Sequence, residues 1–209
     1  MGVGDSGPVT KVGRGPYKVG LAKRAEILDA ALQEFSVVGF EAASLRSIAT
    51  RVGITHAGLQ HHFASKDDLL LGVLLAQEEA DRQFFDADAP LDVDDLIDAY
   101  TRVAERRRST PAWVRLWISL KLSVAAQPEH IAADHVRRRV EAWEQELVDL
   151  FDRAQREGVI AADLDCIDAA RGLLALNEGL MIRQMLDPSI DVDGPLRWAF
   201  AQLHPRDRR

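Results

Sequence analysis

The chain has little of what secreted or membrane-embedded proteins depend on. Cys166 is the single cysteine in 209 residues, so an internal disulfide is excluded and a reducing, cytoplasmic location is expected. No apolar run approaches the ~18 residues that a membrane span needs, and the N-terminus carries no apolar signal segment, so no membrane partner is expected. Apolar residues make up 47% and charged residues 28% of the chain, which is typical of a globular protein.

The net charge of −7 is unevenly distributed. The first 66 residues carry eight basic and five acidic side chains, a balance of +3, which leaves −10 for the remainder. A slightly basic segment on an acidic body can present one face to a polyanion while the rest repels it. On charge alone, chance scatter is an equal alternative.

The N-terminal segment differs in composition from the rest. Residues 1–17 hold five glycines and two prolines, so a flexible basic arm is predicted, with Lys11 and Arg14 among its charges. Such an arm can lie along DNA, or it can be plain disorder. The sequence leaves both interpretations open.

The apolar periodicity is helical throughout, which predicts an all-α fold. A first helix is expected from residue 18 to a C-terminal Gly39, a second is capped by Ser44 and ended by Gly53, and a third is capped by Thr55. Ser65 and Asp68 form a capping box for a fourth. Further helices are expected over about 92–108, 110–126, 128–158, 165–186 and 195–203, with Pro128 and Pro195 in first turns.

Two short helices joined by a tight glycine turn form a helix-turn-helix arrangement. The first of the two is expected to fix the second against the core, so that its outer face is free to enter a DNA major groove. Leu59 and Phe63 are expected to anchor this second helix from below, while its polar side chains face outward.

The stretch from Lys23 to Leu71 resembles the DNA-binding head of the tetracycline-repressor (TetR) family of transcriptional regulators. The resemblance rests on Ile27 to Phe35 with Gly39, on the run Ser44-Leu45-Arg46-Ser47-Ile48-Ala49, on Val52-Gly53-Ile54-Thr55, on Leu59 with His61-His62-Phe63, and on Ser65-Lys66-Asp67-Asp68-Leu69-Leu70. It implies an all-helical homodimer with a helix-turn-helix head at 18–64 and a ligand-binding and dimerisation body at 65–209. Such proteins are usually repressors that a small molecule releases from a palindromic operator.

The resemblance also implies which residues contact double-stranded DNA. Gln60 departs from the family, which most often has a tyrosine at this place, so its role is a phosphate contact or a bidentate contact to adenine. Lys66 is expected to grip a phosphate at the start of the fourth helix. The predicted DNA contacts are Ser44, Arg46, Thr55, His56, Gly58, Gln60, His61 and Lys66.

In the body, aromatic and methionine side chains recur along the predicted helices. They are interpreted either as core packing or as the wall of a cavity for a largely apolar ligand, because flat and soft side chains adapt to varied molecules. A cation site built from aromatic faces and Glu178 is a narrower version of this idea. The candidate ligand-binding residues are Trp113, Leu116, Trp117, Leu120, Trp143, Leu147, Glu178, Met181 and Met185. The helices Asp165–Leu186 and Pro195–Leu203 are expected to form the homodimer interface, as in the family.

Other chemistry finds little support in the sequence. The spacing of His56, His61 and His62 does not place them on one helical face, so no metal site is expected, and no cofactor or catalytic constellation is found. Cys166 is interpreted as structural. The basic triplets 106–108 and 137–139 are expected to be solvated faces with local ion pairs, or contacts to the head. The alternative function is a helical protein that binds or sequesters a small molecule without binding an operator.

Overall fold

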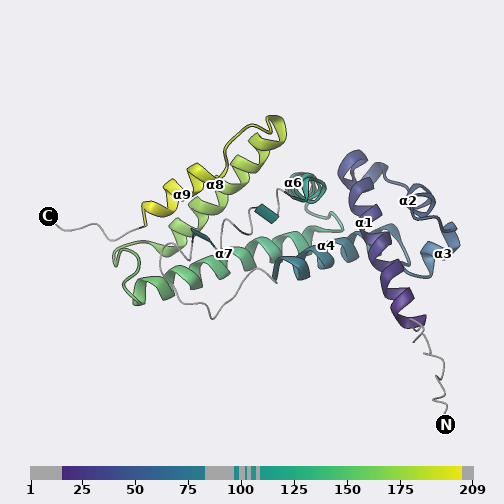
Figure 1. Ribbon diagram of the computed structural model, residues 1–209, viewed down its shortest axis with the longest axis horizontal. Helices are drawn as coiled ribbons and strands as arrows, with labels where there is room; N and C mark the ends of the chain where they lie inside the picture. Colours follow the sequence, from purple (N-terminus) through teal and green to yellow (C-terminus); the bar gives the residue numbers. More distant parts are fainter. Residues whose placement is uncertain (1–15, 83–96, 99–101, 103–104, 107–108, 204–209) are drawn as a thin grey trace, which may run out of the picture.

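The computed structural model describes residues 16–82, 97–98, 102, 105–106 and 109–203. Every regular element in this part of the chain is helical, as predicted, and Figure 1 shows a small head beside a longer body. The body lies to the left of the head in that view, with α4 running beside α7. The helices are α1 (Pro16–Ala42), α2 (Leu45–Arg51), α3 (His56–Gln60), α4 (Lys66–Arg82), α6 (Pro111–Ala126), α7 (Ala133–Arg156), α8 (Cys166–Leu186) and α9 (Asp193–Ala201).

The predicted caps and turns of the head are confirmed. The Ser44 side chain accepts a hydrogen bond from the backbone N–H of Arg46, and Thr55 accepts one from Gly58. Gly39 (φ 79°) breaks the helical path of α1 and Gly53 (φ 68°) separates α2 from α3, both in the left-handed region where glycine carries no Cβ penalty. A short turn continues α1 from Gly39 to Ala42.

Three apolar clusters lie in the described part of the chain, and the two larger ones hold most of its helices together. The first cluster is a continuous core shared by the head and part of the body, since residues of α1 to α4 pack with α6 and the first half of α7. Phe35, Leu59 and Phe63 lie fully inside it. The second cluster packs the end of α7 against α8 and α9, with Phe151 and Phe200 in edge-to-face contact. The segment from Thr55 to Phe63, which contains α3, is therefore anchored in a core that continues into the body.

Two predicted helix boundaries and one predicted capping contact need correction. The helix expected from Pro128 begins at Ala133, because residues 127–132 form a turn in which His130 Nδ1 accepts a hydrogen bond from Ala132. The last helix begins at Asp193, two residues before Pro195. Asp68 accepts a hydrogen bond from the backbone of Ala64 rather than of Ser65. The predicted arm lies mostly outside the described residues, as does most of the 92–108 segment.

None of the helices in the described ranges is long and apolar enough to cross a membrane.

Candidate nucleic-acid interface and effector pocket

The short helix α3 is held from its buried side and from its N-terminus. Leu59 is completely buried and Phe63 is 1% exposed, so the lower face of the segment is fixed in the first core. The Thr55 hydroxyl accepts the Gly58 N–H at 3.0 Å. A Cβ at Gly58 would lie 3.3 Å from that hydroxyl, which explains why a small residue stands there. The outer face remains free of the core.

Seven of the eight predicted DNA contacts lie on α2, α3 and their caps, and Lys66 begins α4. Figure 1 shows α2 and α3 at the outer edge of the head, away from the body. The exposed members of the set are Ser44, Arg46, Thr55, Gln60 and His61, and the half-buried members are His56 and Gly58. Ser44 and Thr55 act as helix caps in this arrangement, and a hydroxyl retains capacity for a second hydrogen bond to a phosphate.

Lys66 is the first residue of α4, and its side chain already has partners on α1. Its ammonium donates hydrogen bonds to the carbonyl oxygens of Phe40 at 2.8 Å and Glu41 at 2.9 Å, and it lies 4.6 Å from the centre of the Phe40 ring. These contacts satisfy the carbonyls at the end of α1, where a cation is favourable. Lys66 therefore joins α4 to α1 in this structure, and a phosphate contact would require it to leave those carbonyls.

Arg24 is a structural residue of the head that the sequence analysis did not find. Its guanidinium donates to the carbonyl of His62 at 2.8 Å and lies 4.0 Å above the Phe63 ring, so α1 holds the end of the recognition segment. Lys23 reaches the carbonyl of Val52 at 3.4 Å. Both side chains are on α1, where the sequence pattern indicates only an apolar face. The partner of Arg24 is 38 residues away in sequence and that of Lys23 is 29 residues away.

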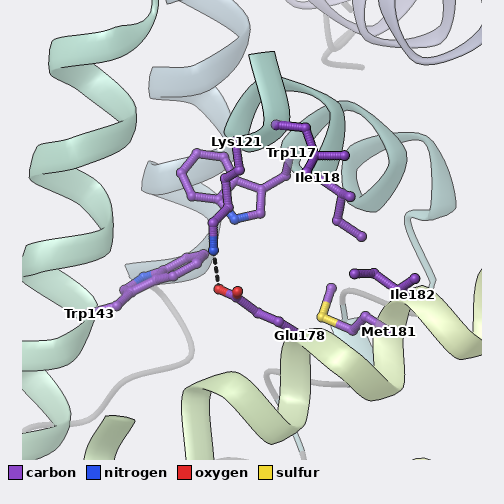
Figure 2. A pocket seen from close by; sticks show the side chains of 8 residues that line it. Trp117, Ile118, Lys121, Trp143, Glu178, Met181 and Ile182 are labelled. Carbon is purple, nitrogen blue, oxygen red and sulfur yellow. Dashed lines mark hydrogen bonds and ion pairs between the residues drawn. The ribbon is translucent and has the colours of Figure 1, made fainter. Parts of the chain in front are cut away.

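A cavity of about 110 Å³ opens between α6, α7 and α8. Figure 2 shows Trp117, Ile118 and Lys121 of α6 on one side, Trp143 of α7 on another, and side chains of α8 opposite. Trp117 and Trp143 meet edge to face with ring centres 5.5 Å apart. The lining residues are Trp117, Ile118, Lys121, Leu122, Trp143, Glu178, Met181 and Ile182.

Four of the nine candidate ligand residues line this cavity, and five do not. Trp117, Trp143, Glu178 and Met181 are brought together in the wall of this cavity. The others pack into the cores or face solvent because the helices turn those positions away. Trp113, Leu116 and Leu120 are buried in the first core, Leu147 is buried in the second, and Met185 is exposed on α8.

Four members of the cavity wall were not predicted from the sequence, namely the charged Lys121 and the apolar Ile118, Leu122 and Ile182. The Lys121 ammonium donates a hydrogen bond to Glu178 Oε1, which joins α6 to α8 across the cavity. A sequence signal was present, since Lys121 stands four residues after Trp117 on the same helix, where side chains share a face.

A buried charge cluster connects α4 to α7. Glu78 Oε1 of α4 lies 3.5 Å from His135 Nε2 and 3.7 Å from Arg139 Nε. Arg139 is 8% exposed, so the expected solvated face is wrong for this member of the triplet, although Arg137 is exposed as expected. Burial lowers the pKa of His135, which Arg138 and Arg139 lower further, against the opposing effect of Glu78. Within the body, α4 and α7 are thus joined by charge as well as by apolar contacts.

Cys166 is buried, and burial raises the pKa of its thiol to about 11, with a further contribution from Asp152. The thiol is therefore protonated near neutral pH and is a poor nucleophile. Among the described residues, no group of three or more histidine, cysteine, aspartate or glutamate side chains is arranged to hold a metal ion.

A capped recognition helix that faces solvent, anchored on a helical body, defines a helix-turn-helix DNA-binding protein. The comparisons name the family. Residues 27–73 match the bacterial regulatory proteins of the tetR family, and residues 92–203 match the C-terminal region of BetI-type transcriptional repressors. The chain belongs to the TetR family of bacterial transcriptional regulators, and it is a DNA-binding transcriptional repressor.

Known relatives agree over most of the chain. The chain is 30% identical to the HTH-type transcriptional repressor KstR2 of Mycobacterium tuberculosis over 151 residues, which cover 69% of this chain and 72% of that protein. The solved structure of Salmonella enterica GusR matches 92% of this chain and 99% of its own, with a TM-score of 0.69 and 27% identity. A TetR-family regulator from Rhodococcus sp. matches 87% and 97% of the two chains, with a TM-score of 0.70 and 23% identity, and so shares the fold.

Proposed function

We propose that this repressor acts as a homodimer that places one copy of α3 in each of two successive major grooves of a palindromic operator, and that a small molecule bound between α6, α7 and α8 releases it. In this proposal the segment 18–64 contacts DNA, and the segment 65–209 binds the effector and the second subunit.

The observation that carries the DNA contacts is the two-sided character of α3. Its buried side is fixed by Leu59 and Phe63, while Gln60 and His61 face solvent from the same short segment. A rigid support with exposed hydrogen-bonding side chains is what groove recognition requires, because base edges are distinguished by the placement of donors and acceptors. Arg46 and the capping hydroxyls add contacts suited to phosphates.

The observation that supports the dimer is an exposed apolar face on α8 and α9. Gly172, Ala175 and Gly179 are exposed and lie three or four residues apart, so they leave a shallow strip along α8 on which another helix can pack closely. Large apolar side chains extend this strip. They are Ile167, Ile182, Met185, Leu186 and Trp198. Such a face is favourable when a second subunit covers it.

Release by an effector requires differential affinity. Because a ligand shifts an equilibrium only as far as it prefers one state, the effector must bind more tightly to the form that does not fit the operator. In a dimer that reads two half-sites, about 34 to 36 Å apart, a change in spacing of the two copies of α3 is sufficient.

Selection of duplexes from a random library by the full-length protein tests the DNA contacts. We expect a palindromic sequence to be enriched, and Gln60→Ala and His61→Ala to reduce affinity for it by about tenfold each, as measured by fluorescence anisotropy. Arg46→Ala is expected to weaken binding to all sequences and to reduce the dependence on salt concentration.

Arg156→Ala provides the matched control for Arg46→Ala, because it removes the same charge from an exposed position at the far end of α7. It should leave both affinity and salt dependence unchanged. If no sequence is enriched, or if the variants in α3 bind like the wild type, α3 is not the recognition helix. The protein would then fit the alternative function, which is binding or sequestration of a small molecule.

A further inference from the structure

The cavity between α6, α7 and α8 is lined by one positive and one negative side chain, which pair with each other. Among the described residues that line it, Lys121 and Glu178 alone are charged, and they are hydrogen-bonded to each other across the space (Figure 2). Their side chains are 25% and 38% exposed, so water screens the pair only in part. The remaining wall is aromatic and aliphatic, which makes this pair the main polar feature that a ligand meets.

The same ion pair also lines a second cavity. This second space of about 180 Å³ shares Lys121, Trp143 and Glu178 with the first. The second space is also balanced in charge, because Arg171 donates hydrogen bonds to Glu144 Oε1 at 2.9 and 3.0 Å. Neither cavity therefore offers an uncompensated charge.

One donor in the wall has no partner. The indole N–H of Trp117 is buried and makes no hydrogen bond with any residue in the described part of the chain. A buried donor without an acceptor is unfavourable, and an acceptor on an incoming molecule would satisfy it. Because the nitrogen itself is buried, Lys121 rather than Trp117 is the donor from α6 that a ligand meets in this structure.

We infer that the cavity selects ligands that carry no net charge, with an apolar body and a polar end that both accepts and donates hydrogen bonds, such as a primary amide. The inference rests on the proposed function, in which this cavity is the effector site. An amide carbonyl accepts from Lys121, and an amide N–H donates to Glu178, while the two charged side chains stay paired. Hydrogen bonds to charged groups are stronger than those between neutral groups.

A singly charged ligand is disfavoured by the same pair. A ligand cation takes Glu178 and leaves Lys121 without its partner, and a ligand carboxylate does the reverse. In either case one charge stays partly buried and uncompensated, which is unfavourable. The sequence suggested that Glu178 and the aromatic residues could bind a ligand cation. In the structure the ammonium of Lys121 already pairs with the carboxylate of Glu178.

Three probes with the same apolar body test the inference. They are 3-phenylpropionamide, 3-phenylpropionate and 3-phenylpropylammonium, titrated into the full-length protein and followed by calorimetry and by the fluorescence of the cavity tryptophans. We expect the amide to bind about tenfold more tightly than either ion in the wild type.

Two variants should change this order in opposite directions. Lys121→Met leaves Glu178 unpaired beside the aromatic wall, so the ammonium probe should become the tightest of the three. Glu178→Gln leaves Lys121 unpaired, so the carboxylate probe should become the tightest. Arg156→Met and Glu157→Gln make the same changes of net charge at exposed positions outside both cavities, and they should keep the wild-type order.

The result that overturns the inference is a wild type that prefers either ion, or variants at positions 121 and 178 that keep the wild-type order. Failure of all three probes to bind the folded protein at about 5 mM also overturns it, because even a ligand of this size should reach millimolar affinity in a fitting cavity. Binding is measured here without DNA. A charge preference without any effect of ligand on the selected operator would instead overturn the effector role in the proposed function.

Discussion

Arg139 stacks its guanidinium 4.5 Å above the ring of Trp143, one turn away on the same helix, while its Nε lies 3.7 Å from Glu78 on α4. Trp143 lines the cavity and Glu78 is on α4, so Arg139 lies between the cavity wall and α4. The residue has three partners, because it also meets Glu146 at 3.5 Å. Because Arg139 is buried, its positive charge must be compensated by these partners for the fold to remain stable.

Arg139→Ala should lower the free energy of unfolding by about 3 kcal/mol, because it removes packing on Trp143 and leaves Glu78 without a nearby cation of full charge. Urea unfolding followed by circular dichroism measures this change. Arg137→Ala on the same helix is the control, since Arg137 is exposed and pairs with an exposed Asp134. It should cost less than about 0.5 kcal/mol. Equal effects of the two variants would contradict the assigned burial.

His135 makes the stability of this cluster depend on pH. Burial holds the pKa of His135 below its ordinary 6.5, with Arg138 and Arg139 acting in the same direction and Glu78 opposing. The unfolded chain therefore takes up a proton that the folded chain resists, and the free energy of unfolding falls as the pH drops through and below 6.5. His135→Gln should reduce the loss of stability between pH 7.5 and 5.5 relative to the wild type.

The control for this pH dependence is Ser47→Ala, because Ser47 is exposed on the head, lies outside the charge cluster and does not titrate between pH 7.5 and 5.5. It should leave the slope of stability against pH unchanged. A slope for His135→Gln equal to that of the wild type would show that His135 does not contribute in the stated direction.

The parts of the molecule that local rules determine were predictable from the sequence. Ser44 and Thr55 cap helices through contacts two and three residues away, and Gly53 marks the turn between them. These signals act over a few residues and do not depend on the rest of the fold. The helix-turn-helix and its exposed face therefore followed from the sequence, and the family comparisons confirmed it.

The parts that helix register determines were not predictable. Lys121 and Glu178 are 57 positions apart, and whether they meet depends on how α6 slides and rotates against α8. The triplet 137–139 shows the same limit. Its members point in different directions around α7, and only the packing of α4 decides that Arg139 is buried while Arg137 is exposed. Long polar side chains at such positions give no local signal of their partners.

Gly72 of α4 should not tolerate even a methyl group. A Cβ at this position would lie 2.8 Å from Cε1 of the Phe63 ring and 3.1 Å from Leu28. Phe63 is 1% exposed and anchors the recognition segment, so it has little room to move. Gly72→Ala should lower the free energy of unfolding by about 2 kcal/mol and weaken DNA binding, despite the better helix propensity of alanine.

Gly20→Ala is the matched control for Gly72→Ala, because Gly20 is also inside a helix but a Cβ there meets nothing within 4 Å. It should raise the free energy of unfolding by about 0.5 to 1 kcal/mol through helix propensity alone. Thermal unfolding of the two variants beside the wild type measures both changes. A stabilising Gly72→Ala would show that Phe63 and Leu28 can rearrange around the added methyl group.

The proposed dimer interface can be tested at a position where the single chain has space. A Cβ at Gly179 meets nothing within 4 Å, and the position is exposed on α8, so Gly179→Leu should leave the folded subunit intact. If a second subunit packs on this face, the leucine side chain holds the two helices apart, and the dimer should dissociate at a concentration about 100-fold higher. Sedimentation equilibrium measures the change.

Gly20→Leu adds the same side chain where α1 also has space, and it should leave the dimer intact. A Gly179→Leu protein as dimeric as the wild type would place the interface elsewhere, and a monomeric wild type would contradict the homodimer itself.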